Sequence, residues 1–135
     1  MRYTFFIVAI LCLIVSACKK SPDRPQSKID FIPINSAITP RTAVLGQDIK
    51  SQVNMGFYSY SADVTFLNFE VKETVARQYE IRAKGFYRNI NYEISLPVVM
   101  TFDTTLSIRP TVGGQHILRF YNHSQLIQAD TVQVN

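Results

Sequence analysis

Apolar and polar residues alternate along most of this chain, and alternation with a period of two is typical of β-strands with one buried and one solvated face. The longest run extends over residues 92–102, where every second residue is apolar and most of the residues between are polar. Further runs with the same period lie at residues 49–57, 64–71, 79–83, 116–120 and 126–134. No stretch beyond residue 18 keeps a helical period, so the sequence predicts an all-β domain.

Two breaks in the alternation predict β-bulges, because an extra residue moves the following side chains to the other face of a strand. The apolar positions change parity near Leu67–Asn68, and again between Ile127 and Val132, near Asp130. Gly, Pro, Asn and Asp residues separate the runs, as expected for turns. About seven strands of this kind within one short domain predict a small β-sandwich.

The C-terminal third of the chain resembles the last two strands of immunoglobulin-like domains. Gly113 and Gly114 precede a strand, residues 122–125 suit a hairpin loop, and His116 stands where those domains carry the aromatic residue of a tyrosine corner. Upstream, residues 43–49 are similar to the turn between the first two strands of the same folds. The resemblance covers residues 40–135 and implies an immunoglobulin-like antiparallel β-sandwich.

The first eighteen residues have the layout of a helical secretory signal peptide, with a basic start at Arg2, an apolar stretch over residues 5–15, and small residues before Cys18. A membrane-spanning anchor is one alternative, but the uncharged run over residues 3–18 is shorter than the roughly 20 apolar residues that a span needs. A cleaved signal without lipid is another. It would leave Cys18 as a free thiol, because Cys12 lies within the removed segment.

The four residues Val15-Ser16-Ala17-Cys18 resemble the lipobox of bacterial outer-membrane lipoproteins of the Bacteroidota type. The resemblance implies that Cys18 is acylated, becomes the new N-terminus and holds the protein on a membrane through several acyl chains. In this class an aspartate directly after the cysteine favours the inner membrane, whereas this chain carries Lys19, which points to the outer membrane. Surface-exported members carry acidic residues after the cysteine, and Lys19 and Lys20 favour the periplasmic face instead.

These features divide the chain into a signal peptide at residues 1–17, a lipidated flexible tether at residues 18–30 and a β-sandwich domain at residues 31–135. The tether is predicted to be flexible because it is polar and contains two prolines. The net charge of +4 would suit a nucleic-acid partner, but residues 31–135 carry nine Lys and Arg against eight Asp and Glu. The basic surplus lies mainly in the signal and the tether, so no nucleic-acid partner is expected.

The sequence contains no recognisable catalytic arrangement. His116 and His123 are the candidate metal ligands, but a corner histidine and a loop histidine explain both, and no second pair of ligands accompanies them. No serine lies in a Gly-x-Ser-x-Gly elbow, and the glutamates are spaced as solvated faces of neighbouring strands. We therefore expect a protein that is not an enzyme and that uses neither a metal nor another cofactor.

Aromatic residues give the remaining functional indication. Tyr58 and Tyr60 form one group and Phe86 and Tyr87 a second, each near a predicted turn. If both groups lie at one end of the sandwich, they form an amphipathic patch suited to an envelope protein or a glycan. The expected function is a membrane-anchored, non-catalytic binding or structural module of the cell envelope. The alternative is an inhibitor or accessory subunit of an envelope enzyme or secretion complex.

Overall fold

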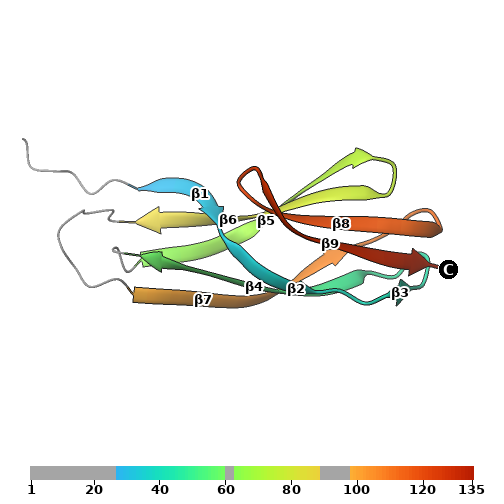
Figure 1. The fold of residues 1–135 in the computed structure, drawn as a ribbon, viewed down its shortest axis with the longest axis horizontal. Helices are drawn as coiled ribbons and strands as arrows, with labels where there is room; N and C mark the ends of the chain where they lie inside the picture. Colours follow the sequence, from blue (N-terminus) through green and yellow to red (C-terminus); the bar gives the residue numbers. More distant parts are fainter. Residues whose placement is uncertain (1–26, 60–62, 89–97) are drawn as a thin grey trace, which may run out of the picture.

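Residues 27–59, 63–88 and 98–135 are described by the computed structural model, and they form two β-sheets packed face to face (Figure 1). This part of the chain contains nine strands and no helix. The predicted all-β, immunoglobulin-like sandwich is confirmed. The predicted signal peptide, Cys18, Tyr60 and the first half of the run at residues 92–102 lie outside the described residues.

Six strands are long: β4 (Ile49–Ser59), β5 (Asp63–Val75), β6 (Gln78–Arg88), β7 (Val98–Ile108), β8 (Gly114–Asn122) and β9 (Gln125–Val134). Three strands are short: β1 (Lys28–Ile32), β2 (Ile34–Ile38) and β3 (Thr42–Ala43). The sequence predicted about seven strands, and the difference lies in the short ones. Two to five residues are too few to show a clear alternation.

Sheet A, of six strands, is built around β6. β5 pairs along nearly the whole of β6, and the opposite edge of β6 is shared by β8, at residues 78–81, and β1, at residues 83–87. β8 is followed outward by β9 and β3. Most of these pairs are antiparallel, but β6 runs parallel to β8 and β3 runs parallel to β9. Sheet B is smaller and antiparallel, with the order β2-β4-β7.

The chain passes from one sheet to the other at Pro33. β1 pairs with β6 in sheet A, whereas β2 pairs with β4 in sheet B. Proline has no N–H to donate to a strand partner, so it suits a break between two pairings. Ile32 and Ile34, on either side of it, are both buried. The crossing segment therefore anchors itself in the core with one side chain from each sheet.

The core lies between the sheets and is supplied by alternate residues of the strands. On β4, Ile49, Ser51, Val53 and Met55 are buried while the residues between them are not, as the alternation predicted. Ser51 is the polar member of this set, and its hydroxyl lies 3.0 Å from the hydroxyl of Thr39. The same alternation buries residues of two strands of sheet A: Ile81, Ala83, Leu118 and Phe120.

The bulge predicted near Leu67–Asn68 is confirmed by the strand register. Phe66 lies opposite Gly85, but Asn68 lies opposite Lys84, so one extra residue stands between them. The apolar alternation stops at residue 102 in the sequence, but the strand β7 continues to Ile108. Thr104 is a polar residue in the same alternate set as the core residues, and Leu106 and Ile108 beyond it are buried.

The second bulge lies at Ile127, and its predicted position near Asp130 is wrong. Phe120 faces Gln128 while Tyr121 faces Leu126, which leaves Ile127 without an opposite residue. Beyond the bulge, every second residue of β9 is partly or fully buried, starting with Gln128. The sequence pattern could not place this bulge because Gln128 and Asp130 are polar and were taken as solvent-facing.

Gln128 faces inward because its side-chain amide forms hydrogen bonds with the backbone of β2. The side-chain amide of Asn122 also binds the backbone of β2, and we call Asn122 and Gln128 the amide clamp. Asn122 Oδ1 accepts a hydrogen bond from Ile34 N–H at 2.5 Å, and Asn122 Nδ2 donates to the Ile34 carbonyl at 3.2 Å. Gln128 makes the equivalent bonds with Ala37 at 3.0 and 2.8 Å. Sheet A is thus joined to sheet B by hydrogen bonds as well as by apolar packing.

Candidate functional site

The chain enters the sandwich at one end, which we call the tether end. The register there places Lys28 of β1 opposite Tyr87, Asp63 opposite Arg88, and Ser59 opposite Val98. The start of β1, the end of β4 and the end of β6 therefore share this end of the molecule, at the left of Figure 1, while the C-terminus lies at the other.

The strands bring Tyr58, Phe86 and Tyr87 to the tether end, although on different sheets. Tyr58 lies on β4 of sheet B, one residue before the strand ends, and is paired with Val99. Phe86 and Tyr87 lie on β6 of sheet A. Tyr60 lies outside the described residues. The three described residues thus lie at one end of the sandwich, as the predicted patch requires. The binding of a partner there stays a prediction.

The Tyr87 side chain takes part in holding two strands together. Its hydroxyl donates a hydrogen bond to the carbonyl oxygen of Phe31 at 2.9 Å, which joins β6 to β1 by a side chain as well as by the strand pairing. Burial, assisted by the negative charge of Asp30, raises the pKa of Tyr87 to about 12. Phe86 has the opposite orientation along β6, and the Arg88 guanidinium lies 5.8 Å from the centroid of its ring. Of the two residues, Phe86 is the one more available to a partner.

The two histidines have separate structural settings. His116 is fully buried, more deeply than the corner position predicted, and its Nε2 donates to the Val112 carbonyl at 2.9 Å. Its ring stacks on that of Tyr79 at 5.9 Å between centroids, with the Tyr79 hydroxyl 3.4 Å from Nδ1. His123 is exposed in the β8–β9 turn with a φ of 52°. Within residues 27–59, 63–88 and 98–135, no three His, Cys, Asp or Glu side chains are grouped to hold a metal ion.

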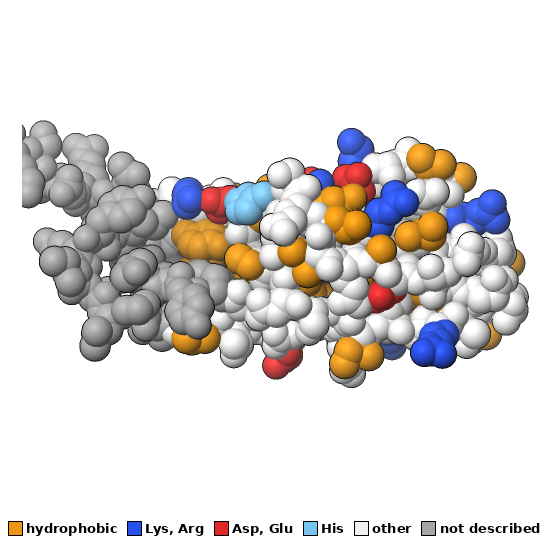
Figure 2. All heavy atoms as spheres, viewed as in Figure 1, with side chains coloured by type: hydrophobic (Ala, Val, Ile, Leu, Met, Phe, Trp, Pro, Cys, Tyr) orange, Lys and Arg blue, Asp and Glu red, His pale blue; other side chains and the backbone are white. Residues whose placement is uncertain are grey.

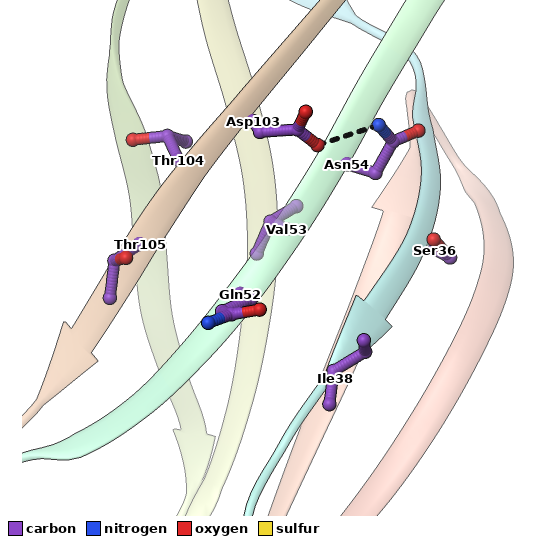
Figure 3. Close-up of a pocket in the computed structure, with 8 residues that line it drawn as sticks. All are labelled: Ser36, Ile38, Gln52, Val53, Asn54, Asp103, Thr104 and Thr105. Carbon is purple, nitrogen blue, oxygen red and sulfur yellow. Dashed lines mark hydrogen bonds between the residues drawn. The ribbon is translucent and has the colours of Figure 1, made fainter.

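A feature that the sequence reasoning missed is a shallow depression of about 340 Å³ on the outer face of sheet B (Figure 3). It is lined by Ser36, Ile38, Gln52, Val53, Asn54, Asp103, Thr104 and Thr105. A chain of side-chain hydrogen bonds orders part of it: Asn35 Nδ2 donates to Asn54 Oδ1 at 3.0 Å, and Asn54 Nδ2 donates to Asp103 Oδ1 at 2.7 Å.

The chemistry of this depression suits recognition by hydrogen bonds. It offers amides, hydroxyls and one carboxylate, with the exposed Ile38 on its edge strand β2. Asp103 is the only titratable side chain in the described lining, so the depression has no acid–base pair for proton transfer. The signal for it was present in the sequence as polar alternate positions, but only the pairing of Gln52 with Thr105 and Asn54 with Asp103 brings them together.

The chain matches no protein-family model, no curated protein and no solved structure. The part that the structure describes also contains no helix of the length and hydropathy that crossing a membrane would require.

Proposed function

We propose that this protein is a lipid-anchored, non-catalytic binding module of the outer membrane, held on the periplasmic face through Cys18. The observation that carries the proposal is the position of Ser27, the first described residue, at the end of the sandwich where β4 and β6 also end. Ser27 stands nine positions after Cys18 in the sequence, which limits the distance between them to about 30 Å. A lipid on Cys18 would thus hold one defined end of the domain close to the membrane.

Recognition of a partner, rather than catalysis, accounts best for the polar groups of the domain. Ser51 and His116, the buried polar residues of the part that the structure describes, are both hydrogen-bonded to neighbouring residues of the fold. The polar groups of the depression on sheet B are exposed and ordered, and they remain accessible to a protein or a glycan. On β4, Tyr58 belongs to the same alternate set of positions as Gln52 and Asn54, so the partner-binding surface is proposed to extend from the depression to the tether end.

The anchor is tested by replacing Cys18 with serine. The variant should remain as unprocessed precursor and should lose all labelling by a fatty-acid probe, because serine offers no thiol for acylation. Cys12→Ser is the matched control, and it should be processed and labelled normally because Cys12 lies in the removed segment. Labelling of the Cys18→Ser variant at the level of the unchanged protein would exclude lipid attachment at this residue.

Partner binding is tested by replacing Tyr58 and Tyr60 together with serine in the full chain. The double substitution should weaken the recovery of a bound envelope protein or glycan severalfold while leaving the melting temperature nearly unchanged, since tyrosines contribute contact area at low entropic cost. The matched control replaces Val44 and Val112 with serine. Both are exposed, at 55% and 53%, and lie at the opposite end. Equal loss of binding in both double variants would show that this end has no special role.

A further inference from the structure

Strand β7 forms a long and regular edge of sheet B. It pairs with β4 on one side, and the register continues over eleven residue pairs without a bulge. The other edge strands in the part that the structure describes are short or interrupted. β1, β2 and β3 have two to five residues, and β5 and β9 each contain a bulge. Short length and bulges are common means by which proteins prevent strand addition at an edge, and β7 has neither.

The backbone of β7 directs one set of its polar groups to this edge. Gly56 N–H donates to the Pro33 carbonyl at 3.1 Å, so Gly56 turns its backbone groups towards β2 and away from β7. Thr101 is paired with Gly56 and therefore points its own N–H and carbonyl away from β4. Because this direction alternates along a strand, the edge presents the backbone groups of Val99, Thr101, Asp103, Thr105 and Ser107. Among the described residues, none forms a hydrogen bond with these groups.

The opposite edge of sheet B is closed. β2 directs the backbone groups of Ile34 and Ala37 away from β4, and the amide clamp binds the N–H and the carbonyl of both residues. A further strand could not pair with β2 there without breaking these four hydrogen bonds. Figure 3 shows β2 and β7 on opposite sides of β4, so sheet B is closed at β2 and open at β7.

The side chains of β7 define what a strand at this edge would contact. Met100 and Phe102 point towards the core but are only partly buried, so they offer apolar surface to the inward side chains of an added strand. On the outward side, Asp103 is the charged residue of β7, and it forms no ion pair with the described residues. Along the lower border of the molecule, where β7 lies in Figure 1, Figure 2 shows an acidic side chain between apolar and uncharged groups. The edge therefore suits an extended segment with alternating apolar residues and a cation opposite Asp103.

Asp103 also disfavours the pairing of β7 with a second copy of the chain. Two β7 strands related by a two-fold axis run antiparallel, and the register with the greatest overlap places the two Asp103 carboxylates directly opposite each other. A shift of two residues, which keeps the faces matched, leaves the carboxylates as diagonal neighbours. Like charges at such positions destabilise a strand pair, so a different polypeptide is the better occupant.

We propose that β7 binds an extended segment of an envelope protein by antiparallel strand addition, an inference that specifies the partner of the binding module proposed above and rests on that function. Backbone hydrogen bonds supply the affinity, while apolar residues against Met100 and Phe102 and a Lys or Arg opposite Asp103 supply the specificity. β7 also lines the depression through Asp103, Thr104 and Thr105. The added strand therefore lies beside the polar groups that are proposed to bind the partner.

The test uses the full chain and a fluorescent peptide with the sequence of β4. β4 already pairs with β7, so the peptide carries side chains that suit both faces of the edge. In the probe peptide, Asn54→Lys places a cation opposite Asp103. In the matched peptide, Asn54→Glu places a carboxylate there. Binding of each peptide is measured by fluorescence anisotropy.

The lysine peptide should bind the unchanged protein severalfold more tightly than the glutamate peptide, and Asp103→Lys should reverse this preference. Asp48→Lys is the control, because Asp48 lies before the first residue of β4 and pairs with Arg109. This control should leave the preference unchanged. Absence of binding by the lysine peptide, or a preference that Asp103→Lys does not reverse, would overturn the proposal.

Amide hydrogen exchange, followed by NMR with and without the lysine peptide, locates the added strand. Exchange at Thr101, Asp103 and Thr105 should slow by about tenfold or more, because their N–H groups acquire acceptors. Ile34 and Ala37 are the internal control, since their N–H groups are already bound by the amide clamp, and their exchange should not change. Slower exchange at β2 alone, or at neither edge, would contradict strand addition at β7.

Thr105→Pro separates this proposal from the proposed function. It removes an N–H that points away from β4, so the pairing with β4 can remain while strand addition is blocked. The variant should lose the binding of the lysine peptide and the recovery of an envelope protein. If it retains that recovery while the Tyr58 and Tyr60 double variant loses it, the domain is a binding module and only strand addition is wrong.

Light scattering covers the remaining occupant of the edge. The unchanged protein should be a monomer, and a dimer that Thr105→Pro dissociates would show that a second copy occupies β7, which would overturn the proposal. If the proline prevents folding, as judged by far-UV circular dichroism, the charge reversal at Asp103 and the exchange measurement still decide between the outcomes.

Discussion

Replacing Phe120 with alanine should lower the free energy of unfolding by about 3–5 kcal/mol. Phe120 is fully buried on β8, which lies between β6 and β9 in sheet A, so the surrounding strands cannot collapse freely into the space left behind. A domain of this size has a total stability of about 5–15 kcal/mol, and the substitution would remove a large share of it. Urea unfolding followed by far-UV circular dichroism is the suitable measurement, because the chain contains no tryptophan.

Arg119→Ala is the control within the same strand. Arg119 points away from the core, and its replacement should change the free energy of unfolding by less than about 1 kcal/mol. Equal losses for the two variants would mean that the assigned faces of β8 are wrong.

The contrast between Phe120 and Arg119 was predictable from the sequence, and so was much of the fold. In a strand with one buried face, side-chain direction follows from position alone, so the alternation at Ile81–Ala83 and Leu118–Phe120 identified the core of sheet A. The bulge at Leu67 was visible for the same reason, since apolar residues stand on both sides of the break. These features depend on local periodicity and need no knowledge of which strands are neighbours.

The pairing of strands was not predictable in this way. The parallel arrangement of β6 and β8, and the passage of the first strand between sheets at Pro33, depend on contacts between residues far apart in the sequence. The bulge at Ile127 was misplaced because an inward glutamine looks like a surface residue until its partner, the backbone of Ala37, is known. Polar side chains that bind backbone atoms inside the sandwich do not follow the rule that inward positions are apolar, so alternation alone assigns them to the wrong face.

At the candidate binding surfaces, too, the sequence predicted the local features but not the contacts between distant residues. The sequence placed Phe86 and Tyr87 near a strand end, but it could not show that the Tyr87 hydroxyl binds the Phe31 carbonyl. Likewise, only the register between β5, β6 and β8 shows that Lys72 and Arg119 both lie opposite Glu80.

The amide clamp leads to the last prediction, which concerns Asn122. Replacing Asn122 with alanine removes the partner of both the N–H and the carbonyl of Ile34, and should cost about 2–4 kcal/mol, since each unpaired, partly buried backbone group costs about 1–3 kcal/mol. Asn122→Asp is the sharper test. It keeps the acceptor for the Ile34 N–H but replaces the donor Nδ2 with an oxygen that faces the Ile34 carbonyl.

The aspartate variant should be destabilised by about 1–3 kcal/mol at neutral pH, and the loss should diminish on acidification. A protonated carboxyl can again donate to the Ile34 carbonyl, so folding should raise the pKa of the new group above its ordinary value of about 3.9. The folded state then binds the proton more readily than the unfolded state, and stability relative to the unchanged protein recovers as the pH falls through the raised pKa. Gln125→Glu, at an exposed position of the same hairpin, is the control and should show no such recovery. Urea midpoints measured at several pH values give the stability of each variant relative to the unchanged protein. An Asn122→Asp variant as stable as the unchanged protein at neutral pH would show that the amide does not hold β2 to sheet A.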